Sequence, residues 1–315
     1  MNATAPRRRG LPGGGFKLGD VKSEIRNSKF EIPPVYNQAT VRRGVLMPKV
    51  TRDDVTLFYE DEGAGSPVLL IHGHTQDRRI WDPVMPRLRE AGIRVLRPDL
   101  RGHGRSARPD LGYHWIDHAA DMAAVLDDAG VDSATVVGYS IGGGIALEMA
   151  LTMADRVGSL VLMSPVMPDR PFEPAFMENL KQVARVARAE GLVAAMTGPW
   201  AESPLFEFSF SKPGVREAAE RITLDFPGAE YLATERDVVK RSWTVPERLA
   251  EIEAPTLVLA GDRETPGFRA WAEEASAAIP GARLDVFENC GHLLPLEEPN
   301  RVARSIIGIG GGARL

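Results

Sequence analysis

A serine stands inside a glycine-rich turn at residues 138–142, where the sequence reads GYSIG. β-Branched residues precede this turn and helix-compatible apolar residues follow it, so Ser140 is expected where a buried strand becomes a helix. Such a sharp turn holds the serine hydroxyl clear of the backbone, and Gly138 and Gly142 leave room for the helix to pass the strand. The spacing predicts a nucleophilic serine whose neighbour, Ile141, offers its backbone N–H to an oxyanion.

Two other kinds of site use similar residues. A glycine-rich turn can cradle a phosphate, but neither the G-x-G-x-x-G pattern nor a P-loop with its lysine occurs in the chain. The stretch HGHTQD at residues 72–77 contains two histidines and a carboxylate, which would bind zinc if all three faced one way. No later histidine pair completes such a set, so the sequence predicts no metal site.

A nucleophilic serine needs a base and a carboxylate that orients the base. His292 lies in the stretch ENCGHLL, directly after the last expected strand, and carboxylates lie in AGDRETP, directly after the preceding strand. The chain order is therefore serine, acid, histidine, which is one of the orders in which hydrolytic triads occur. His292 is the predicted general base, and residues 260–266 hold the predicted acid.

Strands and helices alternate through most of the chain after residue 49. Apolar runs that predict strands occur at residues 55–63, 67–73, 93–99, 134–138, 160–163, 256–261 and 284–287. Helical periodicity appears between them, as at residues 84–91 and 116–126. Buried strands separated by amphipathic helices predict an α/β fold with a mostly parallel central sheet covered by helices on both faces.

The alternation is interrupted between residues 165 and 245, where helical patterns and aromatic residues replace the strand runs. Ligands of open α/β sheets bind beyond the carboxyl ends of the strands, so an insertion that starts from one such end would cover the site. We interpret the segment as a helical cap. Phe172, Trp200 and Phe206 are predicted pocket walls, whereas most aromatic residues of the cap are expected to form its own small core.

The first 46 residues differ from the rest in charge. They hold nine basic and three acidic residues, a balance of +6, whereas the remaining chain holds 29 basic and 40 acidic residues, a balance of −11. Because they show little periodicity, they are predicted to be a poorly ordered N-terminal extension. The predicted organisation is an extension at 1–46, a core at 47–164 and 246–315, and a cap at 165–245.

Composition limits the location and the redox chemistry of the protein. The single cysteine, Cys290, excludes an intrachain disulfide framework and a multi-cysteine zinc site, and it is interpreted as a small buried residue. No run approaches the roughly 18 apolar residues that a membrane helix needs. The basic start is followed by no apolar segment, so it does not read as a secretory signal. The protein is predicted to be cytoplasmic.

From about residue 47 onward the chain resembles the α/β-hydrolase superfamily. The matching motifs are GYSIG, HG at 72–73, DLRGHGRS at 99–106 and the Gly-His pair at 291–292. The resemblance implies the α/β-hydrolase fold, with Ser140 as nucleophile and His292 as the general base that later acts as an acid. It also implies an oxyanion hole formed by the backbone N–H groups of His74 and Ile141.

The third member of the triad departs from the family pattern. The resemblance places the acid three residues after the strand-ending Gly261, and this position holds Glu264 instead of the commoner aspartate. A longer side chain would compensate for a shortened loop, since Pro266 follows almost at once. Asp262 is the competing candidate, and Asp169 is a third one because some relatives place the acid after an earlier strand.

The resemblance also limits the reaction. Relatives with epoxide hydrolase or dehalogenase activity use a carboxylate nucleophile, so a serine indicates acyl chemistry. The implied protein is a serine hydrolase that acts without a cofactor on an ester, a lactone or a C–C bond next to a ketone in a small, partly apolar substrate. A cofactor-free peroxidase side activity is common among similar proteins. The alternative is a receptor-like binding protein with a slow triad. No nucleic-acid or membrane partner is expected, and the oligomeric state stays open.

Overall fold

The computed structural model describes residues 45–228, 231 and 241–310. The described residues all belong to one compact unit. Of the predicted extension, residues 1–46, only the last two are among the described residues. These two, Val45 and Leu46, form strand β1, which was not expected because a two-residue strand shows no periodicity.

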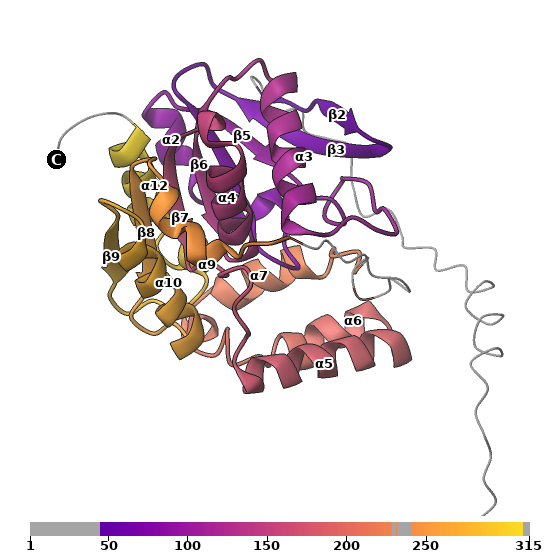
Figure 1. Ribbon diagram of the computed structural model, residues 1–315. Helices are drawn as coiled ribbons and strands as arrows, with labels where there is room; N and C mark the ends of the chain where they lie inside the picture. Colours follow the sequence, from indigo (N-terminus) through magenta and orange to yellow (C-terminus); the bar gives the residue numbers. More distant parts are fainter. Residues whose placement is uncertain (1–44, 229–230, 232–240, 311–315) are drawn as a thin grey trace, which may run out of the picture. The chain divides into compact units, whose positions relative to one another are not determined.

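The described part of the chain contains one nine-stranded sheet (Figure 1). The strands are β1 (Val45–Leu46), β2 (Lys49–Arg52), β3 (Val55–Glu62), β4 (Pro67–Ile71), β5 (Arg94–Pro98), β6 (Ala134–Tyr139), β7 (Val157–Met163), β8 (Thr256–Gly261) and β9 (Arg283–Phe287). Their order is β1-β3-β5-β4-β6-β7-β8-β9, and β2 pairs with β3 outside this path. Strands β1, β2 and β5 run antiparallel to β3, whereas the pairs from β5 through β9 are parallel. The predicted mostly parallel sheet is confirmed, and the carboxyl ends of its parallel strands meet at one edge.

Helices flank this sheet (Figure 1). They are η1 (Arg78–Trp81), α2 (Met85–Glu90), α3 (Trp115–Asp128), α4 (Ile141–Thr152), η2 (Ala154–Arg156), α9 (Val245–Arg248), η5 (Leu249–Glu251), α10 (Pro266–Ala278), α11 (Leu294–Glu297) and α12 (Pro299–Gly310). Helix α3 contacts α4, and α12 contacts α2. Pro266 and Pro299 open α10 and α12, where a missing N–H costs nothing because the first turn has no intrahelical acceptor for it.

A second group of helices lies between β7 and β8, in residues 165–245, which we call the inserted segment. Its helices are α5 (Pro174–Ala189), α6 (Leu192–Ala195), η3 (Met196–Trp200), η4 (Ser209–Ser211) and α7 (Val215–Thr223), and its described residues include no strand. Helix α5 buries Val183 and Ala187 and exposes its polar positions, which gives it one apolar face. Gly191, at φ 94°, separates α5 from α6. In Figure 1 helices α5, α6 and α7 lie apart from the helices that flank the sheet.

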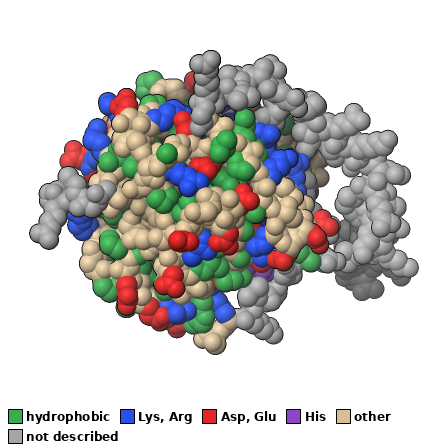
Figure 2. All heavy atoms as spheres, turned by 90° about the horizontal axis from the view of Figure 1, so that it is seen from above, with side chains coloured by type: hydrophobic (Ala, Val, Ile, Leu, Met, Phe, Trp, Pro, Cys, Tyr) green, Lys and Arg blue, Asp and Glu red, His purple; other side chains and the backbone are tan. Residues whose placement is uncertain are grey.

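The central strands form the interior of the fold, and charged side chains cover its surface. Every residue of β6 and β8 is buried, as expected for strands covered on both faces. On the face shown in Figure 2, basic and acidic side chains are interspersed. Some charged residues of the described chain form ion pairs, such as Arg156 and Asp127 at 2.8 Å. Within residues 45–310, as far as these are described, no helix has the length and apolarity to cross a bilayer.

Candidate active site

Ser140 occupies a strained turn between β6 and α4. Its backbone has φ 55° and ψ −117°, a region that costs a non-glycine residue about 1–3 kcal/mol. Its N–H donates to the Met163 carbonyl and its own carbonyl accepts from the Val166 N–H, each at 2.9 Å, so the end of β7 holds the turn. A Cβ atom at Gly138 would overlap the Gly142 carbonyl, because α4 passes directly against β6. The two glycines thus permit the turn that presents the serine.

His292 lies in the loop between β9 and α11 and faces this serine. Its Nε2 atom is 3.1 Å from the Ser140 Oγ. The imidazole is buried, with its ring centroid 5.3 Å from that of Tyr139 and 4.7 Å from that of Phe268. Packing against the Tyr139 and Phe268 rings restricts the His292 imidazole to one orientation.

Glu264 completes a chain of three side chains. Its Oε2 atom is 2.7 Å from the His292 Nδ1, and its Oε1 atom accepts from the Thr265 N–H at 2.8 Å. The Glu264 side chain is fully buried. Because a carboxylate can only accept, His292 carries its proton on Nδ1 and leaves Nε2 free to take the proton of the Ser140 hydroxyl. This is the relative arrangement of nucleophile, base and orienting acid found in hydrolytic triads.

The two competing carboxylates have other partners. Asp262 accepts from the Cys290 N–H at 3.1 Å, and its side chain is 37% exposed. Burial would raise the pKa of Asp262, but hydrogen bonds from the backbone N–H groups of Asn289 and Cys290 hold it below its ordinary value. Asp169 forms an ion pair with Arg241 and accepts from the Val245 N–H at 2.9 Å. Asp262 therefore fixes the loop that bears the histidine, and Asp169 fastens one end of the inserted segment.

The predicted oxyanion donors belong to two backbone turns. Ile141 is the first residue of α4, and the first N–H groups of a helix have no intrahelical acceptor. His74 follows the end of β4, where the neighbouring His72 accepts from the Leu100 N–H at 2.9 Å and contacts the Gly73 carbonyl at 2.8 Å. Burial lowers the pKa of His72 to about 4, so its ring is neutral and keeps this acceptor. These contacts tie the loop after β5 to the turn that carries His74.

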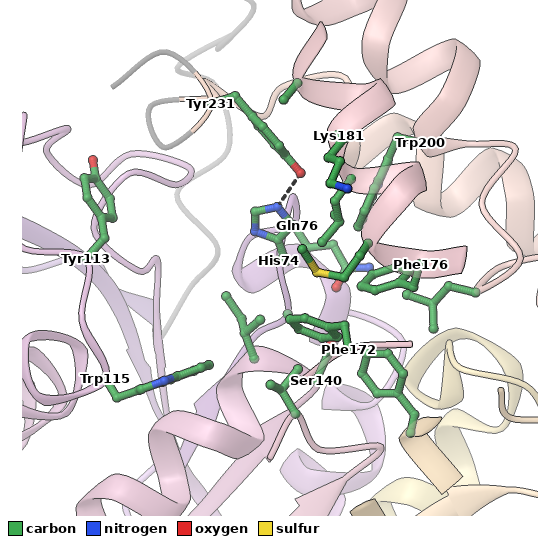
Figure 3. A pocket seen from close by; sticks show the side chains of 18 of the residues that line it. His74, Gln76, Tyr113, Trp115, Ser140, Phe172, Phe176, Lys181, Trp200 and Tyr231 are labelled. Atoms are coloured by element: carbon green, nitrogen blue, oxygen red, sulfur yellow. Dashed lines mark hydrogen bonds between the residues drawn. The ribbon is translucent and has the colours of Figure 1, made fainter. Parts of the chain in front are cut away.

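Ser140 and His292 both line a pocket of about 840 Å³. Figure 3 shows Ser140 among the side chains that surround it. The predicted wall residues Phe172, Trp200 and Phe206 all line it. Both the turn after β4 and the inserted segment contribute residues to the pocket lining. His74 Nε2 of the turn and the Tyr231 hydroxyl of the inserted segment are hydrogen-bonded across the pocket at 2.9 Å. The size and the mainly apolar and aromatic lining suit a small organic ligand.

Sequence reasoning missed several residues of this lining. Trp115 and Phe268 come from helices α3 and α10. Gln76 comes from the turn that carries His74, and Tyr139 is the last residue of β6. Tyr139 could have been found, because it is the variable residue of the serine motif and directly precedes the nucleophile. No periodic signal marks the others, since each reaches the pocket through the packing of distant elements.

Cys290 and the histidines near residue 72 show no sign of metal chemistry. The Cys290 thiol is buried and lies 3.5 Å from the Lys212 Nζ, and burial raises its pKa. Over the described ranges, no group of three or more His, Cys, Asp or Glu side chains is arranged to hold a metal ion. The imidazoles of His72 and His103 instead pack against each other, with ring centroids 5.2 Å apart.

The model of the alpha/beta hydrolase family matches residues 68–305, which is most of the chain. The protein therefore belongs to the alpha/beta hydrolase family, and the fold class expected from the sequence is confirmed.

Named relatives specify the class of enzyme further. The putative carbamate hydrolase RutD of Azorhizobium caulinodans is 30% identical, over 84% of this chain and 98% of its own. Among solved structures, Est816, described as an N-acyl homoserine lactone degrading enzyme, is 30% identical with a TM-score of 0.68, covering 83% of this chain and 99% of that one. A thermophilic esterase from Thermogutta terrifontis is also 30% identical with a TM-score of 0.68, covering 83% and 96%. The protein is a hydrolase.

Proposed function

We propose that this hydrolase cleaves an ester or lactone bond of a small, partly apolar substrate with Ser140 as nucleophile. The observation that carries the proposal is the hydrogen-bonded series from Ser140 through His292 to Glu264, at 3.1 and 2.7 Å. Cleavage of a C–C bond next to a ketone uses the same groups and remains within the proposal. The relatives named as esterases or as a lactone-degrading enzyme favour the ester and lactone reactions.

In the first half of the reaction, Ser140 Oγ attacks the substrate carbonyl carbon while His292 Nε2 takes the hydroxyl proton. The carbonyl oxygen becomes an oxyanion, which the N–H groups of His74 and Ile141 stabilise; losing one such donor typically costs about 10² to 10³ in rate. Glu264 stabilises the imidazolium. The C–O bond then breaks, His292 returns the proton to the leaving oxygen, and an acyl-serine remains.

In the second half, His292 takes a proton from a water molecule whose oxygen attacks the acyl carbon. The same N–H groups stabilise the second oxyanion. The bond to Ser140 Oγ then breaks, the proton returns to the serine, and a carboxylic acid leaves. The aromatic walls at Phe172, Trp200 and Phe206 contact the apolar part of the substrate.

The test is covalent labelling with a fluorophosphonate, followed by a panel of esters, lactones and dienoic ketoacids. The probe should modify Ser140 in the wild type, and Ser140→Ala should lose both labelling and turnover. The control is Ser276→Ala in α10, whose hydroxyl donates to the Glu273 carbonyl, and it should keep both. Hydrolysis that persists in Ser140→Ala would refute the proposal. Ligand-dependent stabilisation without multiple turnover would favour the receptor-like alternative.

A further inference from the structure

One face of helix α5 lines the pocket and changes in chemistry along its length. The lining side chains of α5 are, in chain order, Phe176, Met177, Leu180, Lys181, Ala184 and Arg188. Positions 176, 180, 184 and 188 are four residues apart, so they lie on one face of the helix. Figure 3 shows Phe176 and Lys181 on the side of the pocket that the inserted segment forms. The pocket wall is therefore apolar where α5 begins and basic where it ends.

The apolar end of this face lies beside the proposed base. The ring centroid of Phe176 is 5.9 Å from that of Phe268, which is in turn 4.7 Å from that of His292. A helix rises about 1.5 Å per residue, so Lys181 follows Phe176 by about 8 Å along the axis, and Arg188 follows it by about 18 Å. The two cations therefore lie away from the reacting atoms, at the far end of an apolar wall.

Neither cation is held strongly by a neighbouring residue that the structure describes. The Lys181 Nζ lies 3.3 Å from the Glu178 carboxylate, but both side chains are 63% exposed. Such an exposed pair on one helix contributes only about 0.2–0.5 kcal/mol, so a ligand can replace it. The Arg188 guanidinium makes no hydrogen bond or ion pair with another described residue. Both side chains can therefore turn to an anion in the pocket.

The charge of the pocket wall is opposite in sign to that of the chain around it. Residues 47–315 hold 29 basic and 40 acidic residues. Among the described lining residues, Lys181 and Arg188 stand against one acidic residue, Asp110, which comes from the loop before α3. A cleft lined by an excess of one charge concentrates ligands of the opposite charge. The wall thus favours anions that the rest of the surface repels.

We propose that the substrate is an ester or lactone with an apolar arm that ends in a carboxylate, and that Lys181 and Arg188 bind this carboxylate. The arm lies along the apolar part of α5, so the carboxylate is remote from the scissile bond. A carboxylate next to the scissile bond would instead lie among aromatic side chains such as Phe172 and Phe268, where it would lose water without gaining a cation. This inference rests on the proposed function and adds the substrate class.

The experiment compares esters that differ only at the far end of the arm. Monophenyl adipate and phenyl 5-carbamoylpentanoate carry the acid or the amide on the acyl side, and 6-acetoxyhexanoate and 6-acetoxyhexanamide carry it on the alcohol side. The measured quantity is the ratio of kcat/KM for the acid to that for the amide in each pair. In the wild type at low salt, at least one ratio should be about three- to tenfold, and it should fall toward 1 in about 0.5 M NaCl, because exposed ion pairs are screened.

Charge-removing variants locate the effect on the pocket wall. Lys181→Gln and Arg188→Gln should each lower the ratio by about twofold or more, and the double variant should lower it to 1 or below, because Asp110 and the acidic chain then repel the acid. The change should appear mainly in KM, since the charge lies away from the reacting atoms. The matched control is Arg185→Gln, which removes the same charge from α5 at a position that does not line the pocket, and it should keep the wild-type ratio.

The outcomes separate this inference from the proposed function. Turnover that depends on Ser140, with a wild-type ratio no greater than 1 in both pairs, overturns the inference and leaves the proposed function intact. An equal fall of the ratio in Arg185→Gln and in the pocket variants also overturns it, because net charge would then attract the acid. Absence of turnover that depends on Ser140 overturns the proposed function itself. If a variant does not fold, the wild-type ratio and its salt dependence decide.

Discussion

The sheet and the inserted segment build the pocket in different ways. The sheet contributes Ser140, Glu264 and His292 from turns that directly follow β6, β8 and β9. The inserted segment contributes side chains such as Phe172 and Trp200 from helices and loops that start at one strand end and return to the next. The first set is held by a strained backbone turn that needs glycine at residue 138 and by a side-chain hydrogen bond between Glu264 and His292, which few residue types can make. The second set is held by apolar packing, which tolerates many combinations.

This difference separates the chemistry from the choice of substrate. Substitutions at the strand ends should affect turnover strongly and for all substrates alike. Substitutions in the inserted segment should mostly redistribute activity among substrates, because apolar contact discriminates by only about 1–3 kcal/mol per methylene. Four predictions test the contrast, beginning with the largest expected effect.

The first prediction concerns the two carboxylates that follow β8. Glu264→Gln should lower kcat by about 10³- to 10⁴-fold with little change in KM, since the amide no longer stabilises the His292 imidazolium or fixes its tautomer. Asp262→Asn should leave kcat within a few fold, because Asp262 binds the Cys290 N–H and not the imidazole. Steady-state kinetics of the two variants side by side decides. A collapse in the asparagine variant with an active glutamine variant would assign the acid to Asp262.

The second prediction contrasts one glycine from each region. Gly138→Ala should destabilise the protein by about 3 kcal/mol or more, since its Cβ would overlap the backbone of α4 and neither element can move without displacing the serine turn. Gly198→Ala, in η3 of the inserted segment, should cost clearly less, because no atom from outside its own turn lies within 4 Å of its Cβ position and only its non-helical backbone angles, φ −98° and ψ −111°, oppose a side chain. Thermal unfolding of both variants gives the comparison. Equal losses would show that the two regions are equally constrained.

The same contrast explains what could be predicted from the sequence. Apolar runs and glycines mark the strand ends in the sequence. The order of strands and helices could therefore be predicted, and Ser140 and His292 could be named together as candidate nucleophile and base. The pocket contacts of Gln76 and Phe268 could not be read, because they depend on a turn with positive φ at Thr75 and on the packing of α10 against the inserted segment. The sequence favoured Glu264 over Asp262 only because Glu264 lies three residues after Gly261. The path of the loop in three dimensions decides that Glu264 contacts the His292 imidazole and Asp262 the Cys290 N–H.

The third prediction measures a proton equilibrium within the core. His72 has a pKa of about 4 in the folded protein against 6.5 when unperturbed, because burial disfavours its charged form. Between these values His72 binds a proton in the unfolded chain and not in the folded one, so its contribution to stability falls as the pH is lowered from 6.5 to 4. That contribution is about 3 kcal/mol. Burial raises the pKa of Asp99 to about 6, which acts in the opposite direction, so the measurement is the difference in urea unfolding between the wild type and His72→Gln over pH 4 to 7. An unchanged slope in the variant would contradict the assignment.

The smallest expected effect lies where the two regions touch beside the proposed base. Ser209, in η4 of the inserted segment, donates to the Glu297 carboxylate at 2.7 Å and accepts from the Leu293 N–H at 3.2 Å. Glu297 in turn accepts from the Gly291 N–H at 2.9 Å. The residues on both sides of His292 are therefore held by one network that includes a side chain of the inserted segment.

Ser209→Ala should cost about 1–2 kcal/mol of stability and lower kcat about five- to tenfold, because it leaves the Leu293 N–H unpaired and loosens the loop that bears His292. KM should change little for every substrate, which distinguishes a positioning role from a change in the pocket wall. The control is Ser211→Ala in the same short helix, where the hydroxyl donates to the Phe208 carbonyl and not to the histidine loop. If the two alanine variants have the same kcat, the inserted segment acts only on substrate choice. A selective loss in Ser209→Ala would show that it also positions the base.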